Sequence, residues 1–377
     1  MAETQLLQII RHFLNNEPMT DVPDWPRVWA LAKKHGLAQF VYLYMSGLAA
    51  DMQPDDELQK SISKYYASMV VCHVNQDAAI RDIHSVLEEN ECRHLFFKGS
   101  VTRGRYPDPH WRSMADIDFL YSESQHERVK ATLLENGFSG YKEGRKNDTY
   151  YRKPYVSAEA HRQLVPSDSS FYPYCSHVWE RAHLAAGSAF LYEMSPEDEL
   201  IFSIVHLAIH FLEGGAGIRF VLDIYVYNRL KMDFEYIEQE LLKLDLLDFY
   251  RNISALAENW FGHGEKTELS EKLADFILSS GTFGNAANSS ALAVREGRLK
   301  YVGRMCFPSY REMVSVYPWL KGKILLLPIA WVIRGFRVLR TKKGSVRKLA
   351  KRARRGDKTL GQDLSVFYRE CGLRSSL

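Results

Sequence analysis

Residues 95–121 read LFFKGSVTRGRYPDPHWRSMADIDFLY, and they hold most of the information about the fold. The apolar segments at the two ends predict strands over 94–97 and 115–121, with a polar turn and short helix between them. Successive side chains of a strand alternate between its faces, so Asp116 and Asp118 should share one face. Ile117 and Phe119 should share the other. Two neighbouring carboxylates repel each other unless a cation lies between them, so the pair predicts a site for a hard cation such as Mg²⁺.

The turn after the first strand has the composition of a phosphate-binding turn. Gly99 and Ser100 follow Lys98, and a glycine at such a position lets a phosphate approach the backbone. The basic side chains around the carboxylates are Lys98, Arg103, Arg105 and Arg112. A guanidinium binds phosphate oxygens as a planar fork, and an ammonium binds them as a point charge. The alternative interpretation for Arg112 is an ion pair with one of the two aspartates.

This stretch resembles the nucleotidyltransferases of the DNA polymerase β type, which share a Gly-Ser or Gly-Gly turn followed by an Asp-x-Asp strand. Residues 98–120, KGSVTRGRYPDPHWRSMADIDFL, are more narrowly similar to an uncharacterised nucleotidyltransferase branch of that superfamily. Members of that branch carry a Lys-Gly turn, a Tyr-Pro segment and an Arg-x-Met-x-Asp-x-Asp strand. The similarity extends over about residues 92–230. It implies an α+β fold, in which a small mixed-sheet core is flanked by helical N-terminal and C-terminal regions.

The resemblance also implies a third acid on a later strand. Glu159 matches it, because it precedes His161 by two positions in a strand expected over 154–161, and the family branch has an acid at this place. The family more often has aspartate here, so glutamate is a departure from its pattern. His161 falls on the same strand face as Glu159, so it is expected near the metals or in the acceptor pocket.

The reaction implied by the family is transfer of a nucleoside monophosphate from a nucleoside triphosphate, such as ATP, to an acceptor hydroxyl. Asp116, Asp118 and Glu159 would hold two Mg²⁺ or Mn²⁺ ions, and Glu159 is also the expected general base. The residues expected to bind the nucleotide are Lys98, Gly99, Ser100, Arg103 and Arg112. Neither the NTP nor the acceptor (a small molecule, RNA or a protein) follows from the sequence. The alternative function is a non-catalytic scaffold of the same fold that binds a membrane surface or RNA.

Helical periodicity dominates on both sides of this core. We expect four regions: a helical cap at 1–90, the nucleotidyltransferase core at 91–192, a helical domain at 193–320 and an apolar-basic tail at 321–377. The cap contains one long helix over about 55–89. Within the helical domain, residues 280–298 are expected to form a loop.

The helical domain carries further candidate site residues. Its first helix is predicted to begin at Ser195, an N-cap followed by proline and acids. His206 and His210 lie one turn apart on that helix, which predicts either the wall of an acceptor pocket or a buried hydrogen-bonded pair. Asp223 on the next helix is expected to reach the same pocket and to form an ion pair with Arg219, one turn away.

Composition bounds the class of protein. The chain has 377 residues, 46% of them hydrophobic and 25% charged, which is enough for a sizeable core. Its five cysteines are scattered without Cys-x-x-Cys spacing, which predicts reduced thiols in a cytoplasmic protein and disfavours a cysteine zinc site. The N-terminus lacks the pattern of a signal peptide, and no apolar run reaches the ~20 residues of a membrane span.

The tail concentrates positive charge. Residues 324–333 form an apolar run broken by Pro328, and eleven Lys or Arg with no acid follow over 334–355. The whole chain has a formal net charge of only +3, so the remainder is net negative. Such a tail fits the surface of an anionic membrane, RNA phosphates, or a solvated helix whose apolar side packs on the body. These three interpretations stay open at this point.

Overall fold

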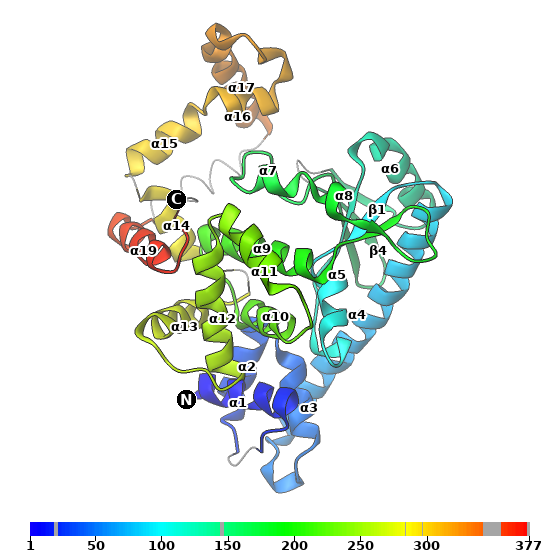
Figure 1. Cartoon of the computed structure of the whole chain (residues 1–377), viewed down its shortest axis with the longest axis vertical. Coiled ribbons are helices and arrows are strands. Elements are labelled where there is room, and N and C mark those ends of the chain that lie inside the picture. Colours follow the sequence, from blue (N-terminus) through cyan, green and yellow to red (C-terminus); the bar gives the residue numbers. More distant parts are fainter. Residues whose placement is uncertain (19–21, 144–146, 283, 296, 342–355, 375–377) are drawn as a thin grey trace.

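The computed structural model describes residues 1–18, 22–143, 147–282, 284–295, 297–341 and 356–374. As expected, the fold is α+β, with one seven-stranded mixed sheet and helical regions before and after it in the chain (Figure 1). The strand order across the sheet is β3-β4-β5-β2-β1-β7-β6. The strands are β1 (His94–Phe96), β2 (Ile117–Tyr121), β3 (Gly140–Lys142), β4 (Asn147–Arg152), β5 (Val156–His161), β6 (His183–Leu184) and β7 (Leu191–Glu193).

Strand β2 lies at the centre of the sheet. It pairs antiparallel with β1 and parallel with β5, and β5 in turn pairs antiparallel with β4. Ile117 and Phe119 of β2 belong to the apolar core shared with α4 (Asp56–Glu89) and α6 (His126–Glu135). Leu120 belongs instead to the larger core of the helical regions. The predicted alternation of side chains along this strand is therefore confirmed.

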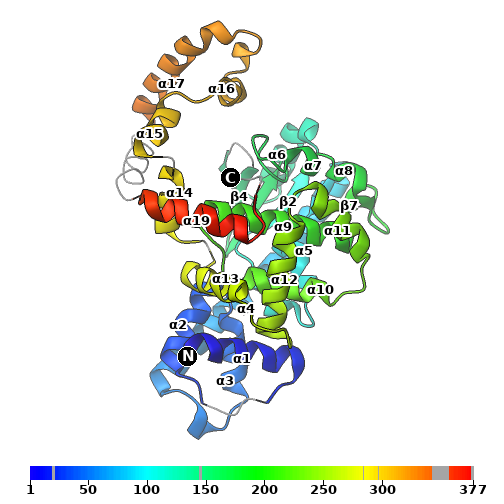
Figure 2. The same cartoon turned by 60° about the vertical axis from the view of Figure 1, so that its left-hand side comes forward.

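The N-terminal region is helical, as predicted. Its helices are α1 (Ala2–Asn15), α2 (Trp25–His35), α3 (Ala38–Ser46) and α4, with a short 3₁₀ turn η1 (Ala50–Met52). The long helix α4 begins beside Asp55, whose side chain accepts a hydrogen bond from the Leu58 amide at 2.9 Å. Ile62 near its start packs in the core with α1–α3, and Leu87 near its end packs under the sheet. One helix thus connects the cap with the sheet (Figures 1 and 2).

Short helical segments connect the strands. They are α5 (Gly99–Thr102), η2 (Arg103–Arg105), η3 (Pro109–Trp111), η4 (Glu123–Gln125), α7 (Tyr172–Cys175) and α8 (Val178–Arg181). The helical domain that follows comprises α9 (Pro196–Glu213), α10 (Ile218–Asn228), α11 (Phe234–Lys243), α12 (Leu247–Phe261), α13 (Glu268–Ser280) and α14 (Ala286–Val294). Helix α9 begins as predicted, because the Ser195 side chain accepts a hydrogen bond from the Asp198 amide at 3.2 Å.

The prediction of a loop over 280–298 is wrong, because this range contains α14. The Asn285 side chain caps that helix by accepting a hydrogen bond from the Ala287 amide at 2.8 Å. Ala291 and Leu292 are buried in the same core as Leu364 of α19 (Lys358–Glu370). Tertiary packing therefore stabilises a segment whose Asn and Ser content favours a loop.

Helices α15 (Arg298–Cys306), α16 (Tyr310–Val316) and α17 (Leu327–Thr341) project from the body as an arm (Figures 1 and 2). Two 3₁₀ turns, η5 (Pro318–Leu320) and η6 (Ile324–Leu326), connect α16 with α17. The arm has a small apolar core of Met313, Tyr317, Leu320 and Ala330. The chain then returns to the body, where the Tyr368 hydroxyl donates to the Phe211 carbonyl at 2.5 Å. The basic segment 342–355 lies outside the described residues.

Among the helices of the described ranges, none combines the length and the apolar character needed to cross a membrane. All five cysteines are free thiols.

Candidate functional site

Two candidate metal-binding carboxylates lie side by side on neighbouring strands. In the parallel pairing of β2 with β5, Asp118 is the direct partner of Glu159. Adjacent parallel strands lie about 4.8 Å apart, so paired side chains on one face converge. Asp118 is buried, with 7% of its surface exposed, whereas the side chain of Glu159 remains 30% exposed. The register of the sheet therefore brings together two acids that are 41 residues apart in the sequence.

A lysine and a histidine contact this pair. Lys98, in the turn that follows β1, places Nζ 2.7 Å from Oδ1 of Asp118. His161 at the end of β5 places Nε2 2.9 Å from the same Oδ1 and 3.3 Å from Oε2 of Glu159. The ligand atoms of Asp118, Glu159 and His161 all lie within 4.8 Å of one another.

The protonation of the acids follows from these neighbours. For Asp118, burial favours the neutral form, but Lys98 and His161 outweigh it and lower the pKa. The hydrogen bond with His161 lowers the pKa of Glu159 against the effect of burial. Asp116, which directly precedes β2, behaves differently. Burial and the charges of Glu159 and Asp118 raise its pKa, against a hydrogen bond with Ser157.

The carboxylates of this cluster fit a magnesium ion better than the histidine does. Mg²⁺ prefers oxygen ligands, which Asp118 and Glu159 supply within a few ångströms of each other. A metal-bound imidazole usually donates its second ring hydrogen to a carbonyl or carboxylate. Nδ1 of His161 is buried and has no hydrogen-bond partner among the described residues. His161 therefore fits the role of a hydrogen-bond donor through Nε2, which holds the two acids together.

The acids open into a cavity of about 340 Å³ between the sheet and α9 and α10. On the side of the sheet, the cavity is lined by Asp116, Asp118 and Glu159. In the turn after β1, it is lined by Lys98 and Gly99. Two guanidinium groups, those of Arg112 and Arg219, line the same cavity. A concave site with carboxylates and several cations has the composition needed to bind a metal together with an anionic ligand.

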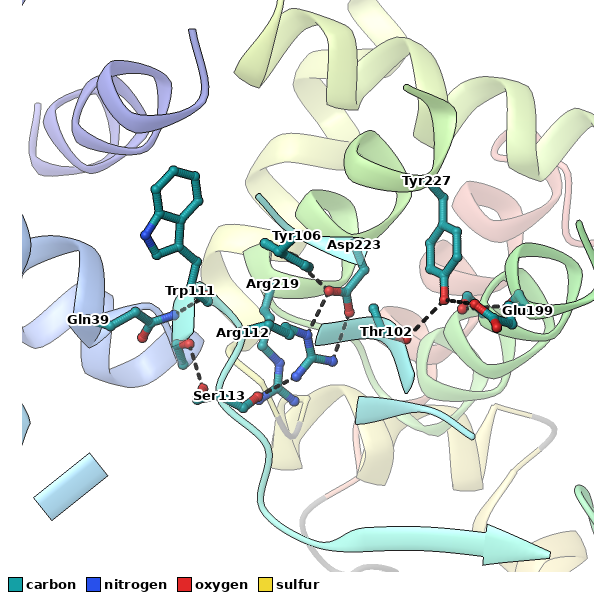
Figure 3. Close-up of polar contacts among 12 residues, drawn as sticks. Gln39, Thr102, Tyr106, Trp111, Arg112, Ser113, Glu199, Arg219, Asp223 and Tyr227 are labelled. Carbon is teal, nitrogen blue, oxygen red and sulfur yellow. Dashed lines mark hydrogen bonds and ion pairs between the residues drawn. The ribbon is translucent and has the colours of Figure 1, made fainter. Parts of the chain in front are cut away.

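Arg112 forms a bidentate ion pair in the cavity wall, and its partner is not the one that the sequence suggested. Its Nε and Nη2 lie 2.6 and 2.8 Å from Oδ1 and Oδ2 of Asp223 on α10, and both residues are buried. The hydroxyl of Tyr106 donates to the same carboxylate at 2.6 Å (Figure 3). Arg112 therefore pairs with Asp223, and the predicted alternative of a pair with Asp116 or Asp118 is wrong. Because both residues line the cavity, a contact of Arg112 with phosphate stays a prediction.

Arg219 lacks the carboxylate partner that was predicted for it. Its Nη1 donates to the carbonyl of Ser113 at 3.3 Å, and its Nε is buried without a hydrogen-bond partner among the described residues. Burial and the neighbouring charge of Arg112 lower the pKa of Arg219 to about 9, although Asp223 opposes them. A half-buried guanidinium with unused hydrogen-bonding capacity beside a cavity is suited to an incoming anion.

The other residues predicted to bind nucleotide have protein contacts of their own. The Ser100 hydroxyl accepts a hydrogen bond from the Asp118 amide at 3.0 Å, and Arg103 forms an ion pair with Asp77 on α4. Gly99 is buried, and a Cβ on it would lie 2.8 Å from Cβ of Met114. Glycine is therefore required here for close packing, which the sequence did not indicate. The nucleotide-binding roles of these residues stay predictions.

The two histidines of α9 face each other in the cavity wall. Nε2 of His206 lies 3.2 Å from Nε2 of His210, and both rings pack near Phe220. Both histidines and Asp223 line the cavity, and their role in an acceptor pocket stays a prediction. His161, by contrast, is fully buried behind the acids and is not part of the lining.

Sequence reasoning missed a second polar network next to the cavity. Arg105 binds the buried Glu199 on α9 through two hydrogen bonds of 2.9 and 2.6 Å. The hydroxyl of Tyr227 on α10 donates to Glu199 at 2.9 Å and contacts the Thr102 hydroxyl at 3.2 Å (Figure 3). Arg105 and Glu199 are 94 residues apart, and Glu199 in the first turn of α9 resembles an ordinary helix-dipole acid. No local sequence signal identifies such a pair.

A second group of possible metal ligands lies at the opposite end of β1. Nδ1 of His84 on α4 is 3.1 Å from Nε2 of His94, and Glu88 completes the group. Glu88 also accepts hydrogen bonds from Ser188 and from the amides of residues 189 and 190. The group therefore connects α4 with the sheet. Because it could also bind a metal ion, measurements of metal binding at the acids need a variant that lacks this group.

Comparison with protein families supplies one match. A family model described as an uncharacterised nucleotidyltransferase matches residues 21–262. The match covers most of the cap, the whole sheet and helices α9 to α12, and therefore includes the acids, Lys98 and both arginines of the cavity. Comparisons with curated proteins and with solved structures found no match.

Proposed function

Since the chain belongs to the uncharacterised nucleotidyltransferase family, we propose that it transfers a nucleoside monophosphate from a nucleoside triphosphate to an acceptor hydroxyl. The proposal depends mainly on one observation. Asp118 and Glu159 are in register on parallel strands and open into a cavity that also contains Lys98 and two arginines. Acids and cations are both needed there, because the reaction combines a metal ion with a highly charged phosphate chain.

The carboxylates of Asp116, Asp118 and Glu159 are the proposed metal-binding groups. When bound, Mg²⁺ or Mn²⁺ would neutralise phosphate charge and stabilise the attacking and leaving oxygens. Without a bound metal, the Lys98 ammonium balances the charge of Asp118 through a 2.7 Å contact. Once a divalent cation takes its place beside Asp118, the ammonium would be available to phosphate oxygens. His161 holds the two acids in place through Nε2.

The triphosphate is proposed to lie along the arginine side of the cavity. Arg219 supplies a guanidinium with a free buried Nε, and Arg112 is held in a fixed orientation by Asp223. The acceptor hydroxyl attacks the α-phosphorus and forms a new P–O bond. The bond from the α-phosphorus to the bridging oxygen breaks, and pyrophosphate leaves with the electron pair. Glu159, whose pKa is lowered by the hydrogen bond with His161, is ionised at neutral pH and accepts the hydroxyl proton.

The test is transfer of label from each of the four α-labelled NTPs, with Mg²⁺ or Mn²⁺, into cell extract separated into small molecules, RNA and protein. We expect label in one fraction with the wild-type protein and none with Asp118→Asn. Asp275→Asn is the matched control, since Asp275 is exposed on α13 and does not line the cavity. Circular dichroism would verify that both variants are folded.

Two results would count against the proposal. Equal labelling by wild type and Asp118→Asn would exclude the acids as the catalytic centre. Metal-dependent NTP binding without labelling of any fraction would favour the alternative, a non-catalytic scaffold that has kept the fold.

A further inference from the structure

The outer face of α17 carries a stripe of exposed apolar side chains. Ile329, Val332, Ile333 and Phe336 are 54, 59, 45 and 71% exposed. Their spacing of three, four and seven residues places them on one face of the helix. Directly before α17, Ile324 and Leu325 of η6 are 60 and 90% exposed. We call these six residues the apolar stripe. Contiguous apolar surface of this kind normally marks an interaction site.

The stripe is not the face that holds α17 in the protein. Ala330, on the inner face, is fully buried in the small core with Met313, Tyr317 and Leu320. The indole of Trp331 donates to the Pro308 carbonyl at 2.8 Å, which fixes the helix further. Figures 1 and 2 both show α16 and α17 at the end of the arm, beyond the sheet and the helical domain. The stripe therefore faces outward on a projecting element.

The sequence that surrounds the stripe is basic. From residue 313 to residue 356 the sequence contains thirteen Lys or Arg and no Asp or Glu. Lys321 and Lys323, immediately before the stripe, are exposed. A partner that covers this surface must therefore accept large aliphatic side chains next to exposed lysines, in a part of the sequence that is rich in Lys and Arg.

We propose that the apolar stripe is a membrane-contact surface that lies on an anionic lipid bilayer. The aliphatic side chains and Phe336 would enter the boundary between head groups and acyl chains, and the flanking basic residues would contact anionic head groups. The ten-residue apolar run at 324–333 is about half of what a spanning helix needs, so the contact involves one leaflet.

Two other partners fit the surface less well. A second copy of the chain would bring the same positive charge against itself, which like-charge repulsion opposes. RNA would satisfy the basic residues, but single-stranded nucleic acid is held mainly by aromatic stacking. Five of the six side chains in the stripe are aliphatic and would stay exposed.

The test is flotation of the full chain with phosphatidylcholine vesicles that contain or lack phosphatidylglycerol, at physiological ionic strength. The stripe variant combines Val332→Ser with Phe336→Ser. The matched control combines Val74→Ser on α4 with Leu242→Ser on α11, since these side chains are 59 and 67% exposed outside the arm. We expect the wild type and the control to float with the anionic vesicles. The stripe variant should bind these vesicles with an affinity reduced by roughly tenfold or more.

Several outcomes would overturn the proposal. One is the absence of flotation with either vesicle, and another is equal flotation of the stripe variant. Self-association that depends on the stripe, measured by light scattering without vesicle binding, would identify a second copy as the partner. Stripe-dependent binding of a single-stranded RNA without vesicle binding would identify nucleic acid. None of these measurements involves nucleotidyl transfer, so the membrane contact and the catalytic proposal can fail separately.

Discussion

Nζ of Lys98 lies 2.7 Å from Oδ1 of Asp118, and the two side chains are only 17 and 10% exposed. The lysine reaches this position from a backbone φ of 53°, in a region that costs energy for a residue with a side chain. A strained lysine thus places its ammonium on the acid that we propose as a metal ligand. In the protein alone, this ammonium competes with any metal cation for Asp118.

Lys98→Met should therefore separate metal binding from catalysis. Without NTP, Mn²⁺ affinity should rise several-fold, because a competing neighbouring charge is worth on the order of 1 kcal/mol in a partly solvated site. Nucleotidyl transfer should fall. Titration calorimetry would measure binding in a His84→Gln background, which removes the second candidate metal group. Lys60→Met, at an exposed position of α4, is the control. Unchanged Mn²⁺ affinity would contradict the proposed position of the metal.

Arg219→Gln should weaken NTP binding without destabilising the fold. The guanidinium is half-buried and its buried Nε has no hydrogen-bond partner among the described residues, so its removal should leave the thermal midpoint unchanged or higher. The loss of a charged hydrogen-bond donor to phosphate should reduce NTP affinity by about tenfold or more. Differential scanning fluorimetry and nucleotide titration would measure the two effects, with the exposed Arg81→Gln as control. A marked fall in stability with unchanged NTP affinity would mean that Arg219 is structural.

Asp223→Asn should be strongly destabilising. It would leave the buried guanidinium of Arg112 without its bidentate partner, which typically costs about 3–5 kcal/mol. Denaturant unfolding would measure the loss. Glu238→Gln is the matched control, because Glu238 forms a comparable 2.7 Å pair with Arg251 on the exposed surface, where the effect should be much smaller. The double variant Arg112→Gln with Asp223→Asn should recover part of the loss, and similar losses for the buried and the exposed pair would argue against this account.

His35 should make the stability depend on pH. Its Nδ1 accepts a hydrogen bond from the Ile218 amide at 3.1 Å, and burial, helped by the charge of Lys34, lowers its pKa from 6.5 to about 4. Between these values the unfolded chain binds a proton that the folded protein does not, so stability falls as the pH drops from 6.5 towards 4. From pH 7 to pH 5 this amounts to about 2 kcal/mol.

Urea unfolding at pH 7 and pH 5 would test this dependence. His35→Gln should lose less stability over this interval than the wild type, because glutamine retains an acceptor but does not titrate. His263→Gln, at an exposed position, should lose as much as the wild type. An identical pH dependence for all three proteins would show that protonation of His35 is not involved.

The sequence predicted features that depend on local pattern. Three predicted features are present in the structure: the alternation of Ile117 and Asp118, the helix start at Ser195 and the long helix α4. All three follow from the periodicity of apolar residues and from helix-capping residues. The α+β class and the family were also predicted correctly. These features are encoded within windows of a few residues, in which side-chain direction and hydrogen-bond partners are fixed by neighbours.

Features that depend on distant contacts were not predictable in this way. The one-turn spacing of Arg219 and Asp223 favoured a pair within α10, but Asp223 accepts from Arg112 and Tyr106 instead. Helix α14 was missed for the same reason, since its burial against α19 is a tertiary effect. Sequence spacing shows which side chains are neighbours on one helix. It does not show whether a group from a distant part of the chain will bind one of those side chains instead.

The pairing of Arg112 with Asp223 also has a consequence for the order in which the chain is made. Asp223 is added to the chain 111 residues after Arg112. At about 5–20 residues per second, the arginine waits roughly 6–22 s for its partner during synthesis. Until then its guanidinium must stay hydrated, so the wall of the cavity cannot close around it. A ribosome-bound chain that ends before α10 would accordingly contain the sheet strands with Asp118 and Glu159, but not a finished cavity wall.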